Sequence, residues 1–225
     1  MAPICYPTIL VVSRLLLIRH GVSTANLDPA VYLRDPDHLI PLAEPEGRQS
    51  CERAGELLRS LAVDPSTVCA WHSPYRRCLQ TQEHVLEYAF GSAAASVFRR
   101  ESFLLREQEF GDWDGLSESE IAAADPRRAE FRKKLEHHRG AFYFRYPFGE
   151  SRADVVQRTT MFVGKLHRSS FETHVISLHG VTQRALRMSW FNYPVTWFEH
   201  EPNPKNGTVV LIERDENGSW HERYM

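Results

Sequence analysis

Two histidine–glycine pairs, His20-Gly21 and His179-Gly180, each lie just beyond a short, largely aliphatic run. Such runs, where a glycine ends them, are typical of buried strands in an α/β sheet. Arg19 precedes the first pair, and a third junction, "HSPYRRCLQT", brings Arg77 to the first turn of a predicted helix. Ligands of open α/β sheets bind just outside the carboxyl ends of the strands. We therefore expect Arg19, His20, Arg77 and His179 to converge on one point.

This set of side chains matches the charge and shape of a phosphoryl group. A guanidinium grips two oxygens at once, and helix N-termini add partial positive charge. Asn26 and backbone N–H groups would supply further donors. A neutral imidazole among these cations can attack phosphorus, because its ring nitrogen is nucleophilic near neutral pH. The residues therefore indicate phosphoryl chemistry with a histidine nucleophile.

Each signal also has a structural interpretation. A lone strand-end histidine is usually a hydrogen-bonded structural residue, and Arg76 and Arg77 alone are more often a solvated helix face. Metal binding is a sharper competitor, because the chain has 11 histidines. The sequence contains no HExxH, however, and His137-His138 lacks the i, i+4 spacing that places two ligands on one helix face. Three such junctions in one chain favour the phosphoryl site, and we assign no metal ligands.

The rest of the chain alternates between predicted strands and helices. Ser73-Pro74 is interpreted as an N-cap with proline at the first helical position, and Ser117 with Glu120 as a capping box. Glu216-Asn217-Gly218 predicts a type I′ hairpin. Strands are predicted at about 15–18, 67–71, 95–99, 174–178, 207–213 and 219–224, and a loop at 27–45. Three helices are predicted to begin at Glu46, after Pro74 and at Ser151 with Asp154. Two more are predicted over 117–138, with a break near Asp125-Pro126, and over 181–192.

This alternation predicts the α/β class, as a three-layer α/β/α sandwich with a mostly parallel central sheet. The 225 residues are 42% hydrophobic and contain no repeat, low-complexity stretch or long linker, so we expect one domain over residues 1–225. The net charge of −2 predicts no bulk attraction to nucleic acid or to an anionic membrane.

Cysteine use and the first residues bear on where the protein works. Cys5, Cys51, Cys69 and Cys78 are scattered, which favours reduced thiols in a cytoplasmic protein. The apolar stretch 8–18 is interrupted by Arg14 and is too short to span a bilayer as a helix. We expect a cytoplasmic location.

Five blocks of the sequence resemble the histidine phosphatase superfamily, the phosphoglycerate-mutase-like proteins. "LIRHGVSTAN" is similar to the RHG signature, and "SPYRRCLQT" to a Ser-x-x-x-Arg-Ala-x-x-Thr helix start with Cys78 in place of alanine. "LREQEFGDWDG" resembles the segment that carries the acid. "FGESRADVVQR" resembles the Gly-Glu-Ser helix start, and "ISLHGVTQRAL" the second histidine block. The blocks follow one another in family order through nearly the whole chain, which implies a phosphoglycerate-mutase-like fold.

The resemblance implies a role for each matching residue. His20 would be the nucleophile that becomes phosphohistidine, and Glu107 would be the proton donor. Spacing alone leaves Glu109, Asp112 and Asp114 open as donors. No metal or organic cofactor is implied. The phosphate pocket and its substrate contacts would comprise Arg19, Asn26, Arg77 and His179, with Ser23 as a further donor, and Arg19 and His179 would also act in catalysis.

The superfamily contains both phosphatases and cofactor-dependent phosphoglycerate mutases. The mutase pattern has Phe-Thr-Gly-Trp after the RHG segment, and residues 27–43 lack it. The Arg127-Arg128 pair differs in spacing from the pair that mutases use, and a solvated helix face explains it better. We therefore predict hydrolysis of a phosphorylated small-molecule substrate. A non-catalytic phosphate-binding regulatory module is the alternative of another class.

Two features are left open by the sequence. The basic segment 127–145 is interpreted either as a lid that admits a multiply charged substrate or as an exposed helix with local charge pairs, and the second is favoured. A homodimer also stays open, because nothing in the sequence fixes the oligomeric state.

Overall fold

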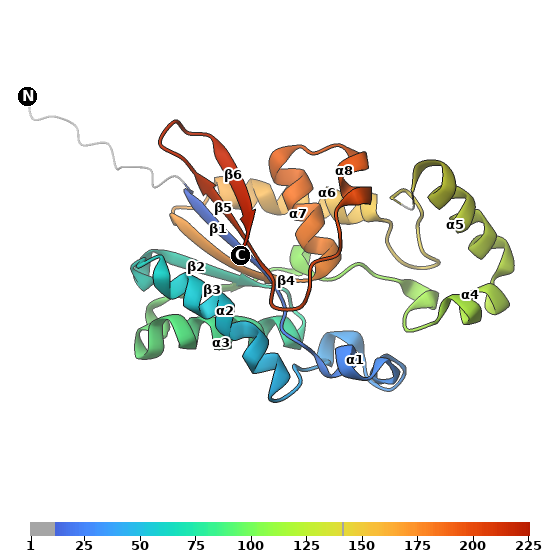
Figure 1. The fold of residues 1–225 in the computed structure, drawn as a ribbon, viewed down its shortest axis with the longest axis horizontal. Helices are drawn as coiled ribbons and strands as arrows, with labels where there is room; N and C mark the ends of the chain where they lie inside the picture. The colour runs from blue at the N-terminus through green and yellow to red at the C-terminus, as the bar shows by residue number, and fades with distance from the viewer. Residues whose placement is uncertain (1–11, 141) are drawn as a thin grey trace, which may run out of the picture.

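A computed structural model describes residues 12–140 and 142–225, and a six-stranded sheet lies at its centre (Figure 1). The four strands β3, β2, β4 and β1 are parallel neighbours in that order, β5 pairs antiparallel with β1, and β6 pairs antiparallel with β5. The predicted, mostly parallel sheet is therefore confirmed. The strands are β1 (Arg14–Arg19), β2 (Val68–His72), β3 (Phe98–Glu101), β4 (Thr173–Leu178), β5 (Val209–Arg214) and β6 (Trp220–Tyr224).

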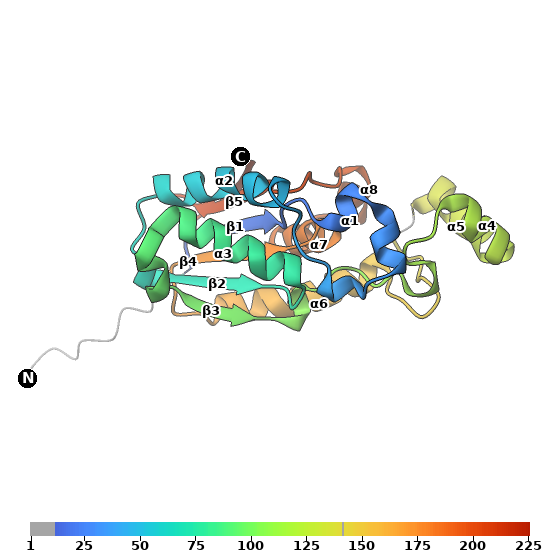
Figure 2. The same ribbon diagram turned by 90° about the horizontal axis from the view of Figure 1, so that it is seen from below.

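Helices cover both faces of this sheet (Figure 2). Alternate residues of β1 point to opposite faces: Leu16 and Ile18 pack with α2 and α3, whereas Leu15 and Leu17 pack with α6 and α7. This double burial explains the continuous aliphatic run and confirms the three-layer α/β/α sandwich. The helices are α1 (Thr24–Leu27), α2 (Glu46–Ser60), α3 (Arg76–Phe90), α4 (Glu118–Ala124), α5 (Pro126–Arg139), α6 (Arg152–His167), α7 (Gly180–Phe191) and α8 (Val195–His200).

Side-chain hydrogen bonds cap α4 and α6 at the starts that the sequence predicted. Ser117 and Glu120 form a capping box at the start of α4, and Ser151 and Asp154 form another at the start of α6. Asp125 ends α4 and accepts a hydrogen bond from the backbone of Arg128, so the predicted break separates α4 from α5. The α4–α5 pair projects from the sandwich in both ribbon views.

Several local predictions were wrong. β3 begins three residues later than expected, because residues 91–96 form a 3₁₀ helix. Only Gly218 of the Asn217-Gly218 pair has a positive φ, whereas a type I′ turn needs one at both central positions, so the hairpin closes by another turn. The predicted loop 27–45 contains two 3₁₀ helices, at 29–33 and 37–39, whose short turns carry no apolar periodicity.

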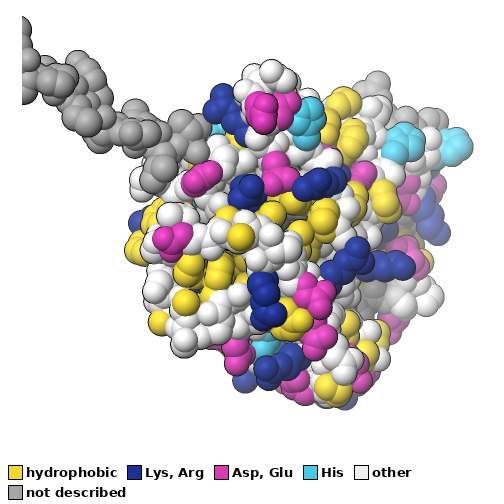
Figure 3. All heavy atoms as spheres, turned by 60° about the vertical axis from the view of Figure 1, so that its left-hand side comes forward, with side chains coloured by type: hydrophobic (Ala, Val, Ile, Leu, Met, Phe, Trp, Pro, Cys, Tyr) yellow, Lys and Arg dark blue, Asp and Glu magenta, His cyan; other side chains and the backbone are white. Residues whose placement is uncertain are grey.

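Cys51, Cys69 and Cys78 are free and buried, and Cys5 lies outside the described residues. Within the described chain no helix combines the length and apolar character needed to cross a membrane. On the face of the molecule drawn in Figure 3, acidic and basic side chains are interspersed with apolar ones. That face therefore presents no field of one sign.

Candidate active site

The carboxyl ends of three adjacent strands carry the residues that the sequence singled out. β2, β4 and β1 are neighbours in the sheet, and Arg19 on β1 lies in register with Leu178 on β4. His20 therefore follows β1 beside His179, which follows β4. α3 and α7 begin just beyond β2 and β4, so their N-termini add partial positive charge at this edge.

A cavity of about 380 Å³ opens at this edge. The residues that line it include Arg19, His20, Asn26, Arg77 and Glu107. Most of the predicted site residues thus share one cavity, although they come from three separate segments of the chain. His179 lies beside it, with its ring centroid 5.2 Å from that of His20.

The His20 side chain has one ring nitrogen engaged. Nδ1 lies 2.8 Å from the carbonyl oxygen of Gly21, and because a carbonyl can only accept, Nδ1 carries the proton. Nε2 therefore keeps its lone pair. Burial, together with the charges of Arg77 and Arg19, holds the pKa of His20 well below its usual value. The geometry thus presents a neutral, nucleophilic imidazole at the strand end.

Gly21 lets the chain after His20 pack closely against the start of α2. A Cβ at this position would lie 2.6 Å from the carbonyl oxygen of Gly47, which is closer than real Cβ contacts. The backbone N–H of Gly21 donates to the Thr81 hydroxyl at 2.9 Å, and that hydroxyl donates to the carbonyl of Arg77. The backbones that carry His20 and Arg77 are thereby held in one hydrogen-bonded unit.

Arg19 and Arg77 are anchored in the same way. Arg19 donates from Nη1 to the carbonyl oxygen of Pro204. Arg77 donates from Nη1 to the carboxylate of Asp37 and to the Asp37 carbonyl, each at 2.7 Å. In both residues Nε is buried and has no hydrogen-bond partner within the described residues. Two guanidiniums with unused donors therefore flank His20, which suits a group rich in acceptor oxygens. Arg76, by contrast, is exposed.

His179 is the second buried imidazole. Its Nδ1 accepts from Arg77 Nη2 at 3.4 Å, and its Nε2 lies 2.8 Å from the Ser73 hydroxyl. Burial and the Arg77 charge hold its pKa well below the usual value. Ser73 is therefore not the N-cap that the sequence predicted. Tyr75 occupies the N-cap position of α3 and makes no side-chain capping hydrogen bond, and the hydroxyl of Ser73 contacts His179.

Glu107 is placed by a buried charge network. Arg158 donates to both carboxylate oxygens of Glu150 at 3.0 and 3.1 Å and to the backbone carbonyls of Leu104 and Glu107. Arg106 joins Glu150 from the other side at 2.5 Å. This network fixes the segment that carries Glu107. Burial raises the pKa of the Glu107 carboxyl, against the lowering effect of the Gln108 N–H and nearby arginines.

The other acid candidates lie in different surroundings. Glu109 forms a 3.1 Å salt bridge with Arg106, and its side chain is 50% exposed. Asp112 is exposed and does not line the cavity. Asp114 lines the cavity, on the same wall as Trp113. Glu107 and Asp114 thus both line the cavity, and the charges of Arg77, Arg19 and Arg158 act on the Glu107 carboxyl.

Ser23, Asn26 and Asn206 form a polar cluster at the start of α1. The hydroxyl and N–H of Ser23 both donate to Asn26 Oδ1, and Asn206 Nδ2 donates to the same oxygen at 3.0 Å. The Asn26 oxygen is thus saturated, which leaves its NH₂ group for a ligand. Ser23 caps α1 and does not line the cavity.

Asn206 is a site residue that the sequence did not reveal, because Asn206-Gly207 has only the signature of a turn. Its Nδ2 also donates to the carbonyls of His20 and Gly21 at 3.2 and 3.3 Å. Asp37, Arg158 and Glu150 were likewise missed as site residues. Their roles depend on contacts between distant segments, and the Gly-Glu-Ser block gave the only signal, for Glu150.

Asn206→Ala removes the donor that ties α1 to the His20–Gly21 backbone. We expect kcat/KM to fall about tenfold while the fold persists, because an unmade partly buried hydrogen bond costs about 1 kcal/mol or more. Hydrolysis assays and thermal melting test this. Lys205→Ala changes an exposed neighbour and is the control. Equal activity of the two variants would remove Asn206 from the site.

The basic segment 127–145 lies apart from this cavity. Arg128 pairs with Asp125, Arg132 with Glu118 and Glu136, and Lys134 with Glu130. None of its described residues lines the cavity. The structure therefore supports the interpretation as an exposed helix with local charge pairs rather than as a lid.

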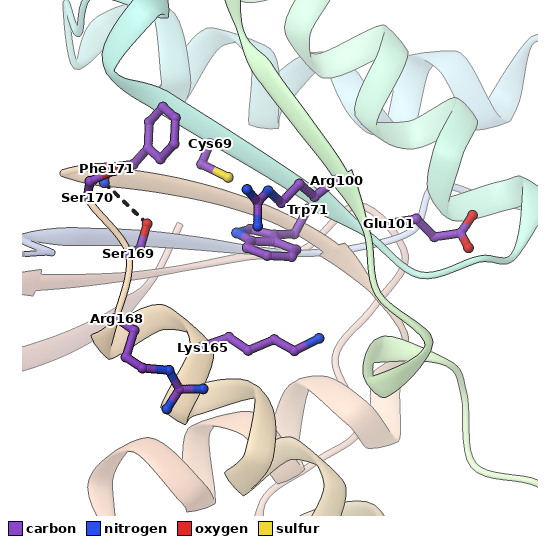
Figure 4. A pocket seen from close by; sticks show the side chains of 9 residues that line it. All are labelled: Cys69, Trp71, Arg100, Glu101, Lys165, Arg168, Ser169, Ser170 and Phe171. Atoms are coloured by element: carbon purple, nitrogen blue, oxygen red, sulfur yellow. Dashed lines mark hydrogen bonds between the residues drawn. The ribbon is translucent and has the colours of Figure 1, made fainter.

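A larger cavity, of about 500 Å³, lies between β3 and the end of α6 (Figure 4). Arg100, Lys165 and Arg168 surround it, and Glu101 points away from them. Its only thiol belongs to Cys69, whose pKa burial raises to about 12, so the thiolate is scarce at neutral pH. The described residues contain no group of histidine, cysteine and acidic side chains arranged to hold a metal ion. The His20 cavity is therefore the candidate active site.

The chain is similar to known proteins over most of its length. The chain is 32% identical to phosphoglycerate mutase-like protein AT74 of Arabidopsis thaliana, across 92% of this chain and 66% of that protein. It is 31% identical to broad-range acid phosphatase DET1 of Saccharomyces cerevisiae, across 90% and 86%. YhfR of Bacillus stearothermophilus superposes with a TM-score of 0.70 at 26% identity, across 92% and 94%.

The family model that matches this sequence spans residues 15–225, from the first strand to the last residue. All five sequence blocks lie within that span. The chain belongs to the histidine phosphatase superfamily, branch 1.

Proposed function

We propose that this protein hydrolyses phosphomonoesters through a phosphohistidine on His20, with Glu107 as proton donor. One observation carries the proposal: His20, whose Nε2 is free, lines one cavity with two guanidiniums whose buried Nε donors have no partner within the described residues. Arg19, Arg77 and the amide of Asn26 would bind the phosphoryl oxygens, with His179 beside them. Ser23 would act indirectly, by orienting Asn26.

The first step transfers the phosphoryl group to the protein. The Nε2 lone pair of His20 attacks phosphorus, the ester P–O bond breaks, and its electron pair leaves with the alcohol oxygen. Glu107 gives its proton to that oxygen, so the alcohol departs neutral and Glu107 becomes a carboxylate. Arg19 and Arg77 stabilise the charge that develops on the phosphoryl oxygens.

The second step returns the protein to its starting state. A water molecule attacks phosphorus, and the Glu107 carboxylate accepts one of its protons. The N–P bond breaks, its electron pair returns to Nε2, and inorganic phosphate leaves. No residue beyond those in the cavity is required, and no metal ion has a task in either step.

Mutase activity and phosphate binding without turnover are less well supported. A mutase must hold a second anionic group of its substrate, yet apart from Arg19 and Arg77 the described lining residues of the cavity include no lysine or arginine. A binding module would need neither a free nucleophile nor an acid with a raised pKa. The similarity to a broad-range acid phosphatase also favours hydrolysis.

The test compares hydrolysis with isomerisation in one preparation. With a metal chelator present, we expect nitrophenyl phosphate to be hydrolysed. We expect 3-phosphoglycerate, with bisphosphoglycerate as primer, to give little 2-phosphoglycerate. Phosphate release and the two phosphoglycerates are measured in parallel. Efficient isomerisation would assign a mutase, and phosphate binding without release from any ester would assign a binding module.

A further inference from the structure

The residues that line the active-site cavity besides the predicted phosphate-binding and catalytic set, here called the outer half, differ from that set in character. Three aromatic rings line it, those of Tyr32, Phe110 and Trp113, together with the carboxylates of Asp37 and Asp114. The described lining residues of this half include no lysine and no arginine. The alcohol part of a bound phosphomonoester would therefore meet rings and negative charge.

The two carboxylates are not equivalent. Asp37 is held by Arg77 through a 2.7 Å salt bridge, so its charge is balanced. Asp114 forms no salt bridge with any described residue. Burial raises the pKa of Asp114, and so does the charge of Asp37, which means that the two carboxylates share one electrostatic environment. Asp114 is thus the carboxylate of the outer half whose charge no described residue balances in a salt bridge.

The wall that carries Asp114 is well supported. The Trp113 ring stacks on Phe144 with centroids 5.5 Å apart and packs in an apolar cluster with residues of α4 and α5. On the other side, a Cβ on Gly115 would lie 3.2 Å from the Cβ of Tyr32, so this wall packs directly against the 3₁₀ helix at 29–33. Trp113 and the backbone on either side of the exposed Asp114 are therefore supported both by the α4–α5 pair and by the 3₁₀ helix.

We propose that this outer half selects phosphomonoesters whose alcohol carries a positive charge, such as phosphorylated amino alcohols, and disfavours those whose alcohol carries an anionic group. Ammonium groups are attracted both by carboxylates and by the faces of aromatic rings. A carboxylate or a second phosphate in the same place would instead be desolvated beside Asp114. This inference rests on the proposed hydrolase function and names the substrate class of the same site.

The test uses three esters of similar size that differ in charge: phosphoethanolamine, propyl phosphate and phosphoglycolate. For the unmodified protein at neutral pH, we expect kcat/KM to decrease in that order. Asp114→Asn should lower the ratio of phosphoethanolamine to phosphoglycolate about tenfold, since one charge at cavity distances changes an interaction by this order. The ratio cancels any general loss of activity. Asp112→Asn removes the same charge from an exposed neighbour outside the cavity and should leave the ratio unchanged.

The possible outcomes distinguish a failure of the substrate preference from a failure of the proposed hydrolase function. Equal or reversed preference among the charged esters, with propyl phosphate hydrolysed, would overturn the inference and leave the hydrolase function intact. An equal change of the ratio in Asp112→Asn and Asp114→Asn would also overturn it, because the effect would then be one of overall charge. Failure to hydrolyse any ester, propyl phosphate and nitrophenyl phosphate included, would refute the hydrolase function itself.

Discussion

His20→Ala is expected to lose turnover by a factor on the order of 10⁴ or more, since deleting a catalytic nucleophile removes the whole covalent route. Brief reaction of the unmodified protein with phosphate-labelled ester, followed by rapid quenching, should trap a label that survives base and is lost in acid. His20→Ala should carry no such label. The reason is geometric: Nδ1 is bound to the Gly21 carbonyl, so only Nε2 offers a lone pair to phosphorus.

Two further variants guard this prediction against a folding defect. His20→Asn keeps a side-chain donor for the Gly21 carbonyl but has no nucleophilic nitrogen, so it should fold and still carry no label. His221→Ala changes a histidine on the β5–β6 hairpin that pairs with Asp215 and should behave like the unmodified protein. Label on His20→Ala, or undiminished hydrolysis by it, would show that another group is the nucleophile.

Cys78 is the competing nucleophile within reach of the site. Its Sγ lies 3.4 Å from His179 Nε2, a spacing that resembles a cysteine–histidine pair. Burial raises the pKa of the thiol, however, and the pKa of His179 is lowered, so proton transfer from sulfur to imidazole is unfavourable. Cys78→Ala should therefore retain both the phosphoryl label and the activity. That result would exclude Cys78 as the nucleophile and leave His20.

The sequence predicted the elements whose cause is local. The run from Leu15 to Ile18 is aliphatic at every position because both faces of β1 are covered, and Ser151 with Asp154 caps α6 within its own first turn. Ser73 shows where this reasoning fails. Its type and the following proline fit an N-cap, but its hydroxyl lies against His179, 106 residues away, and α3 starts later.

The same limit applies to the site. The residues at strand ends could be grouped, because parallel strands bring their carboxyl ends to one edge. Asn206 reaches His20 across 186 residues, and Asp37 reaches Arg77 across 40, through loops whose paths no periodicity specifies. Glu107 could be separated from Glu109 only once the structure placed one carboxyl in the cavity and the other on Arg106.

Glu107→Gln is expected to lower hydrolysis of an alkyl phosphate by about 10²–10⁴-fold, the usual contribution of a general acid. A departing alkoxide needs a proton, whereas nitrophenolate is stable without one. The same substitution should therefore reduce nitrophenyl phosphate hydrolysis far less. Measuring kcat for propyl phosphate and nitrophenyl phosphate with both proteins gives the comparison. Equal losses on the two esters would indicate a structural role for Glu107.

Glu109→Gln is the matched control, because it makes the same chemical change two residues away on a carboxyl that faces Arg106 and solvent. It should show no dependence on the leaving group. If it does, and Glu107→Gln does not, Glu109 is the donor. Asp112→Asn and Asp114→Asn extend the comparison to the other two carboxyl groups that the spacing left open.

The pH profile gives an independent reading of the same residue. The Glu107 pKa is raised, so its proton is present at low pH and is lost as the pH rises through that pKa. The His20 pKa is lowered, so the imidazole stays neutral and nucleophilic in the acid range. It gains a proton, and loses its nucleophilic lone pair, only when the pH falls below that lowered pKa. Alkyl phosphate hydrolysis should thus peak on the acid side, between the two values. In Glu107→Gln the fall with rising pH should disappear while the fall at low pH remains, because the amide has no proton to lose and His20 is unchanged. If Glu107→Gln instead removed the decrease in rate at low pH, Glu107 would be the group that must be deprotonated, and its role as proton donor would be wrong.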